Sequence, residues 1–396
     1  MQSGCLDDSY TGTVYVGEYV DGSVPHEVIM TLGKTESDTK SSTATKGSGV
    51  IGEISNFEGK DFYIYAFNKE VESEFSVLAS EDNIRCLIDG TLDDPNTLMG
   101  RKAHWDSWTS SIQWGVGDSP IYYPMGEHKG HDYDFFAYYL DNIEPQNSDI
   151  KRGKTDVKIN IEIDGCQDIM SAKAKPTDMQ LAAIEDERER LYQQAHCYSY
   201  YTASHNLNPN FDFKHHLVKL DFKLVPGGTP GMTKDVTVEK IEVVSKYKGT
   251  FTVADKNDTG KMGVRFKDDK KRLELKEIDG SEFRPRVIST FNGTGSVNDI
   301  DDLGSLIVAP DDEYYLYIVL SEEYGDIVLD RTETELYIYQ GQKDGDRIEF
   351  TAGNEYLITL TIYGQMDVRV SADIGEWNSG GGFDYDHDEA FRPGKN

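Results

Sequence analysis

Hydrophobic and polar residues alternate over many short segments of the chain, and Gly, Asn and Asp residues stand between these segments. A period of two residues is typical of a β-strand that buries one face and leaves the other in water. Residues 157–163 alternate cleanly, whereas residues 134–140 are almost continuously apolar or aromatic, which predicts a strand buried on both faces. The predicted strands span residues 13–20, 28–32, 62–67, 134–140, 157–163, 218–224, 236–244, 314–320, 335–339, 356–363 and 366–374.

One segment has a helical period instead. Pro176, Thr177 and Asp178 are typical of a helix start, and apolar residues share one face as far as Ala195. The opposite face carries the charged run at residues 185–190. One short helix among many strands punctuated by turn residues predicts an all-β protein made of antiparallel β-sandwiches.

The 396 residues are enough for two or three domains. Residues 33–49 are rich in Ser, Thr and Gly and have no apolar period, which predicts a flexible linker. We expect an N-terminal arm and linker at residues 1–49, tethered to the body rather than part of its core. One sandwich should then occupy residues 50–211 and a second residues 212–396.

Acidic residues outnumber basic ones, 71 to 40, and the formal net charge is −31. Binding to nucleic acid depends on Lys and Arg side chains that neutralise phosphates, so this balance argues against a nucleic-acid partner. It argues equally against attraction to a bare anionic membrane surface. No apolar run in the sequence is long enough to cross a bilayer as a helix.

The four cysteines form no CxxC pair and have no spacing typical of a metal site. Cys86, Cys166 and Cys197 lie in the segments expected to fold. Their odd number excludes a complete disulfide framework, and three buried thiols are the favoured interpretation, with a Cys166–Cys197 bridge as the alternative.

Cys5 stands apart, in Ser3-Gly4-Cys5 followed by acidic residues. Small residues before a cysteine near the start resemble the end of a bacterial lipobox, after which the cysteine is acylated. No charged or apolar leader precedes it, so we expect any signal peptide to have been removed already. Cys5 is the predicted lipidation site, and an ordinary cysteine is the alternative.

Signatures of catalysis are absent from the sequence: there is no GxSxG, HExxH or P-loop motif, and no GxGxxG motif that precedes a predicted helix. We therefore predict no enzymatic activity and no cofactor. Two polar clusters contain residue types that could bind a metal ion, but a solvated turn or tail is favoured for both. They are a zinc-like group at His128, His131, Asp132 and Asp134, and a calcium-like group at Asp384, Asp386, Asp388 and Glu389. His215 and His216 are adjacent at a strand, so their rings should point apart, as core or rim residues.

Trp105, Trp108 and Trp114 cluster within ten residues. Exposed indole rings at such a density could stack on sugars, although tryptophan is more often packed against a core. A glycan-binding surface at these residues is therefore kept as the alternative function.

Several segments resemble the fimbrillin-like proteins of Bacteroidales. Ile-Tyr-Tyr-Pro at residues 121–124, a polar loop and Tyr-Asp-Phe-Phe-Ala-Tyr-Tyr at residues 133–139 resemble one of their signatures. The other similar segments, in the same order as in the family, are residues 49–54 with 62–67, 167–170 with Ala172, 213–224, and 356–363 with 370–377.

This resemblance implies a subunit or accessory lipoprotein of type V fimbriae, at the cell surface or outer membrane, with two tandem transthyretin-like sandwiches. In the family, a trypsin-like protease removes the N-terminal arm, and a strand of a neighbouring subunit fills the groove that is left. The implied partners are other fimbrial subunits, the outer membrane through a lipid anchor, and ligands on host or bacterial surfaces. An edge that loses a strand exposes unpaired amides and an apolar slot, which strand addition satisfies.

For this chain we expect residues 13–32 to pair with the body as an exchangeable edge strand, with Val14, Val16, Val28 and Met30 in the slot. One feature departs from the family, whose stalk subunits are cut after arginine. The first arginine here is Arg85, and the linker offers only Lys34, Lys40 and Lys46 as processing sites. A tip, an anchor or a surface lipoprotein that does not polymerise therefore remains open beside a stalk subunit.

Overall fold

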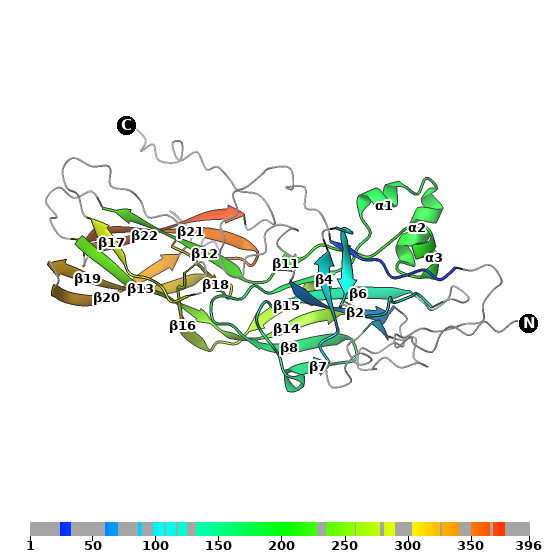
Figure 1. Cartoon of the computed structure of the whole chain (residues 1–396), viewed down its shortest axis with the longest axis horizontal. Coiled ribbons are helices and arrows are strands. Elements are labelled where there is room, and N and C mark those ends of the chain that lie inside the picture. Colours follow the sequence, from blue (N-terminus) through cyan, green and yellow to red (C-terminus); the bar gives the residue numbers. More distant parts are fainter. Residues whose placement is uncertain are drawn as a thin grey trace, which may run out of the picture.

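The chain folds into two β-rich lobes that lie end to end, with a small group of helices at the outer end of the N-terminal lobe (Figure 1). The computed structural model describes residues 24–32, 60–69, 86–88, 98–106, 108–115, 118–124, 132–227, 235–257, 259–277, 281–289, 303–324, 327–339, 350–364 and 367–376. Among these residues, no helix is both long and apolar enough to span a membrane.

A seven-stranded antiparallel sheet is the centre of the N-terminal lobe, in the order β11-β9-β6-β2-β4-β5 with β3 also paired to β2. Its strands are β2 (Asp61–Asn68), β3 (Cys86–Ile88), β4 (Arg101–Asp106), β5 (Ser111–Trp114), β6 (Tyr133–Tyr139), β9 (Met170–Lys173) and β11 (Lys214–His215). A four-stranded antiparallel sheet, ordered β15-β14-β8-β7, faces it. Its strands are β7 (Ile150–Arg152), β8 (Asp156–Glu162), β14 (Lys248–Asp255) and β15 (Gly263–Phe266).

The central sheet is buried on both faces. In β6, Phe135 and Ala137 belong to one hydrophobic core, whereas Phe136 and Tyr138 belong to a second core against β8 and β14. The aromatic run of β6 is therefore a strand buried on both faces, as its sequence predicted, because each face packs against a different apolar layer. The facing strand β8 has the predicted single wet face: its residues alternate between buried and solvent-facing positions.

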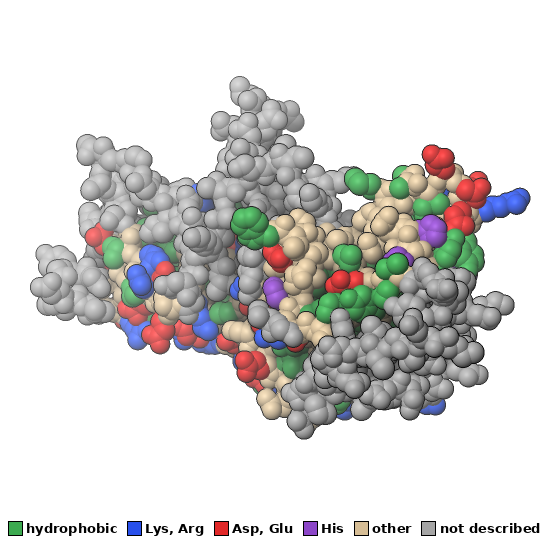
Figure 2. Space-filling view, turned by 45° about the vertical axis from the view of Figure 1, so that its right-hand side comes forward, with side chains coloured by type: hydrophobic (Ala, Val, Ile, Leu, Met, Phe, Trp, Pro, Cys, Tyr) green, Lys and Arg blue, Asp and Glu red, His purple; other side chains and the backbone are tan. Residues whose placement is uncertain are grey.

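The C-terminal lobe is a second sandwich, with one sheet ordered β18-β12-β21-β22 and the other β16-β13-β19-β20, to which β17 adds beside β13. Its strands are β12 (Val218–Pro226), β13 (Asp235–Lys246), β16 (Lys270–Glu274), β17 (Arg286–Ser289), β18 (Ser305–Val308), β19 (Glu313–Tyr324), β20 (Ile327–Tyr339), β21 (Asn354–Gly364) and β22 (Asp367–Glu376). Alternate residues of both sheets fill a single core. The outer face of the second sheet carries interleaved acidic and basic side chains, seen at the lower left of Figure 2.

The predicted helix exists, but it is not continuous. It is divided into α1 (Asp178–Ala182) and α2 (Glu187–Ala195), followed by α3 (Tyr200–Ser204). The described residues also include 3-10 turns at Asn147–Asp149 and Thr259–Lys261. Thr177 caps α1 by accepting a hydrogen bond from the Gln180 amide. The Asp186 carboxylate then accepts from the Glu189 amide and starts a new helix, so the prediction of one helix over residues 176–195 was wrong in its length.

The hairpin of β14 and β15 follows a strand of the C-terminal lobe but belongs to a sheet of the N-terminal lobe. After β13 in the C-terminal lobe, β14 pairs antiparallel with β8 of the N-terminal lobe, with Phe251 opposite Ile159. The Phe251 ring lies 6.1 Å from the Tyr138 ring and is fully buried. A boundary at residues 211 and 212 thus separates strands that share a sheet, because residues 248–266 complete the N-terminal lobe. The all-β class and the antiparallel sandwiches predicted from the sequence are confirmed.

The hairpin generates a prediction for stability. Replacing Phe251 with Ala removes a ring that joins the two sheets, and such a change in a core costs about 3–5 kcal/mol. Urea denaturation of Phe251→Ala should show a loss of that size, whereas Thr250→Ala, on the solvent side of the same strand, should lose less than about 1 kcal/mol. Equal losses for the two variants would contradict the role given to this hairpin.

Candidate functional site

Residues 24–32 lie against the N-terminal sandwich as an inserted extended segment. Val28, Met30 and Leu32 are 3%, 0% and 6% exposed and belong to its hydrophobic core, whereas Ile29 between them is 47% exposed. This alternation is that of a strand with one buried face. The expectation that the arm lies outside the core was therefore wrong for this part of it, and Val28 and Met30 do occupy an apolar slot.

The backbone of this segment is paired along its length. The Val28 amide donates to the Ile121 carbonyl at 2.7 Å, and the Tyr123 amide donates to the His26 carbonyl at 3.0 Å. Farther along, the Ile112 amide at the edge strand β5 donates to the Met30 carbonyl at 2.9 Å. The segment therefore covers amide and carbonyl groups that would otherwise be left open at the edge of the body.

The end of the segment pairs with another part of the chain. Strand β1 (Thr31–Leu32) runs parallel to β10 (Asn210–Phe211), and the Thr31 amide donates to the Pro209 carbonyl at 3.0 Å. The Thr31 hydroxyl donates to the Asn210 side-chain oxygen at 2.9 Å. The slot is thus formed by β5 and residues 121–123 together with the segment that follows α3.

Tyr200 on α3 holds the start of the segment. Its hydroxyl donates to the Val24 carbonyl at 2.9 Å, and its ring meets the His26 ring edge-on at 4.8 Å. Both contacts lie near the surface, so they anchor the segment without enclosing it. Tyr200, His26 and Asn210 were missed by the sequence analysis, because their roles depend on contacts between residues far apart in the chain.

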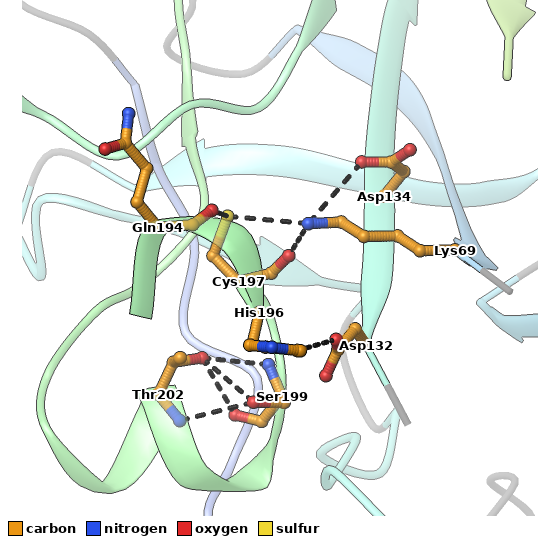
Figure 3. A network of polar contacts seen from close by, with 8 residues as sticks. All are labelled: Lys69, Asp132, Asp134, Gln194, His196, Cys197, Ser199 and Thr202. Carbon is orange, nitrogen blue, oxygen red and sulfur yellow. Dashed lines mark hydrogen bonds and ion pairs between the residues drawn. The ribbon is translucent and has the colours of Figure 1, made fainter. Parts of the chain in front are cut away.

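A polar network holds the connection between α2 and α3 against β6 (Figure 3). The Lys69 ammonium lies 3.9 Å from the Asp134 carboxylate and donates to the Cys197 carbonyl. At the end of α2, His196 Nδ1 lies 2.7 Å from Asp132. These contacts hold the end of α2 and the start of α3 against the central sheet. Burial raises the pKa of the Cys197 thiol, which keeps it protonated.

The described members of the zinc-like group, Asp132 and Asp134, have other partners. Asp132 and Asp134 serve the polar network, and His128 and His131 lie outside the described residues. Within the described residues, no group of three or more His, Cys, Asp or Glu side chains could hold a metal ion. Asp384, Asp386, Asp388 and Glu389 also lie outside the described residues.

The adjacent histidines, whose rings were predicted to point apart, have separate partners. His215 Nδ1 lies 3.0 Å from Asp168, and His216 Nε2 lies 2.7 Å from the Ser171 hydroxyl. Burial lowers the pKa of His216 to about 4, so it is neutral at pH 7 and acts as a packed, hydrogen-bonded ring. Cys166 and Cys197 are free thiols, so the alternative of a bridge between them is not realised.

The three tryptophans do not form one platform. Trp105 is 5% exposed in the core, and Trp114 packs under the Arg101 guanidinium, which lies 4.9 Å from its ring centre. Trp108 is 94% exposed at the tip of the β4–β5 hairpin. A stacking site on this hairpin is thus reduced to a single ring.

Cys5, Val14 and Val16 lie outside the described residues, as do Lys34, Lys40 and Lys46. The structure therefore describes the inner part of the predicted edge strand and neither the lipidation site nor the processing sites.

The family model of fimbrillin-like proteins matches residues 91–377, and the chain belongs to this family. Among solved structures, a candidate cell adhesion protein of Bacteroides uniformis is 17% identical, with a TM-score of 0.45, over 91% of this chain and 100% of that one. A fimbrial protein of Bacteroides vulgatus is 12% identical, with a TM-score of 0.45, over 89% and 100%. The tip fimbrial protein Mfa3 of Porphyromonas gingivalis is 9% identical, with a TM-score of 0.37, over 89% and 100%. A comparison with curated proteins finds no match.

The slot generates a second prediction. Met30→Ala should cost about 2–5 kcal/mol of unfolding free energy, because it leaves a cavity in the core. Ile29→Ala, whose side chain faces outward, should cost less than about 1 kcal/mol. Urea denaturation of both variants tests this, and a Met30→Ala protein as stable as the parent would mean that the segment contributes nothing to the fold.

Proposed function

We propose that this protein is a structural and adhesive component of type V fimbriae on the bacterial surface, and that it assembles by strand exchange after loss of its N-terminal arm. Membership of the fimbrillin-like family supports the fimbrial part of this proposal. The observation that carries the strand exchange is the insertion of residues 24–32 into the N-terminal sandwich. Both lobes would then be transthyretin-like sandwiches, as in the family.

Removing the segment would leave two kinds of unsatisfied surface. The amides of Ile112 and Tyr123 would lose their carbonyl partners, and an apolar slot would open where Met30 is now fully buried. A strand from a neighbouring subunit satisfies both at once, because its backbone restores the hydrogen bonds and its side chains fill the slot. Each restored bond contributes roughly 0.5–1.5 kcal/mol beyond the burial of side chains.

The geometry of the slot also restricts its occupant. An exchanged strand must present apolar side chains at every second position, as Val28, Met30 and Leu32 do, and it must tolerate solvent at the position of Ile29. Cleavage after Lys34, Lys40 or Lys46 would cut the covalent connection between residues 24–32 and the body. A lipid on Cys5 would hold the protein at the outer membrane before that step.

The test removes the arm by proteolysis and then measures whether a peptide of the same sequence binds to the remaining body. Trypsin should cut the linker while sparing the body, and the body separated from its arm should form multimers or melt at a lower temperature. A labelled peptide of residues 24–32 should then bind the separated body, and the same peptide with Met30→Asp should not, because a carboxylate is costly in the slot. Fluorescence anisotropy and size-exclusion chromatography give the readouts.

A body lacking residues 1–46 that stays monomeric with an unchanged melting temperature would reduce the arm to a tether. The strand-exchange mechanism would then be abandoned for this chain, whereas its membership of the family would stand.

One observation favours a second candidate function, a surface lipoprotein that binds glycans and does not polymerise. Trp108 is held outward by its own turn: the Asp106 carboxylate accepts from the Trp108 amide at 2.9 Å and from the Thr109 hydroxyl at 3.0 Å. An exposed ring on a fixed turn is suited to stacking on a sugar.

Glycan-array binding of the intact protein tests this candidate. Binding at sub-millimolar concentration should be lost in Trp108→Ala and kept in Tyr315→Ala, which removes an exposed ring from the other lobe. If no glycan binds, or if both variants bind alike, the Trp108 hypothesis is wrong.

A further inference from the structure

The C-terminal sandwich has one pair of parallel strands among the described residues, β12 and β21, and Lys219 lies directly opposite Glu355 in that pair. Val218 and Leu220, on either side of Lys219, point into the core. Lys219 and Asp221 therefore lie together on the outer face of this sheet, beside Glu355.

That outer face is covered where Lys219 stands. The Lys219 side chain is only 4% exposed, although lysine is almost never buried without partners. Its cross-strand neighbour on β18, Ile307, is 1% exposed, belongs to a core of the N-terminal lobe and donates its amide to Gly165. Lys219 thus lies where the two lobes meet.

Two carboxyl groups approach the Lys219 ammonium. Nζ lies 3.1 Å from Asp221 Oδ2 and 3.3 Å from Glu355 Oε2. The Ser305 hydroxyl also donates to Asp221. The Lys219 amine, itself almost fully buried, is therefore held against two carboxyl groups, and the Asp221 and Glu355 side chains are 24% and 33% exposed.

The two carboxyl groups differ in charge. Burial, followed by the hydrogen bond and the negative charge of Asp221, raises the pKa of Glu355 to about 8, so it is mostly protonated at pH 7. For Asp221, burial opposes ionisation, but the hydrogen bond from Glu355 and the charge of Lys219 outweigh it and lower the pKa. Carboxyl groups driven apart in this way divide into an acid and a base.

We propose that Lys219 and Glu355 become joined by an intramolecular amide bond, with Asp221 as the base. The Asp221 carboxylate takes a proton from the Lys219 ammonium, and the free amine attacks the carbonyl carbon of the protonated Glu355. The C–N bond forms, the carbon loses its hydroxyl as water with the proton held by Asp221, and the amide nitrogen releases its second proton to solvent. One ammonium and one carboxylic acid thus give one amide, one water and one proton, with no change of oxidation state.

Deprotonation of Lys219 is the demanding step. Burial opposes its charge, but Asp221 and Glu355 together raise its pKa. The reaction needs to occur only once in the life of each molecule, so a slow step is compatible with it. The bond would connect β12, the first strand of the C-terminal sandwich, to β21. A force that pulls on the two ends of the chain would then pass through this bond and would not extend residues 220–354.

The same lobe contains a matched control. Lys240 lies 2.7 Å from Glu242, two residues along its strand, and 3.1 Å from Glu274 on the neighbouring strand. The pattern of one lysine and two carboxyl groups is the same, but the Lys240 side chain is 32% exposed and the Glu274 side chain 45%. Because water stabilises the ionised forms there, Lys240 should form no amide.

Mass spectrometry of the full chain tests the proposal. The intact protein should be lighter than its sequence by one water, and a tryptic digest should contain one branched peptide joining Lys219 to Glu355, with no cleavage after Lys219. Cleavage after Lys240 should be complete. An intact mass equal to that of the sequence, with Lys219 open to trypsin and to amine labelling after denaturation, would overturn the proposal.

Variants separate the roles of the three residues. Asp221→Asn keeps the nucleophile and the carbonyl carbon but removes the base, so it should have the uncrosslinked mass. Lys219→Met should have the mass of its own sequence, and Lys240→Met should still lose one water. A branched peptide that joins Lys219 to Asp221, or that persists in Asp221→Asn, would contradict the assigned roles.

Discussion

Burial of the central sheet on both faces is the constraint on which the N-terminal lobe depends. A sheet with two apolar faces cannot be stable in water until each face is covered, because every buried ring left open loses its hydrophobic contribution. One face of β6 is covered by a core that includes residues 28–32 and parts of the helical segment. The other face is covered by β8 and β14. The N-terminal lobe therefore needs both the N-terminal segment and a strand that follows β13 to complete its cores.

This constraint explains which features the sequence could predict. A period of two residues reports directly on a face buried in a sheet, so β6, β8 and β12 and the pairing of Val28 and Met30 on one face were predicted. Periodicity does not name the partner strand, so it could not show that β14 leaves the C-terminal lobe or that Thr31 pairs with Asn210. Such pairings follow from the competition between many possible edges in the folded chain.

Local polar groups account for the other differences. The apolar stripe of residues 181–195 suggests one helix, but the Asp186 side chain competes for a backbone amide and starts a second one. The clustering of three tryptophans in the sequence suggests a shared surface. Alternation along β4 and the turn at Asp106 instead send Trp105 inward and Trp108 outward. In both cases the pattern along the sequence was read correctly, but the position or direction of a single side chain determines the local structure.

The hairpin that crosses between the lobes also sets an order of events during biosynthesis. Strand β8 is synthesised well before β14, and until β14 is in place the core side of Ile159 and Tyr138 lacks the Phe251 ring. Contacts between residues so distant in sequence form late and slowly. A partly synthesised chain therefore holds an incomplete first lobe, which is completed only after β13, a strand of the second lobe, has also been made.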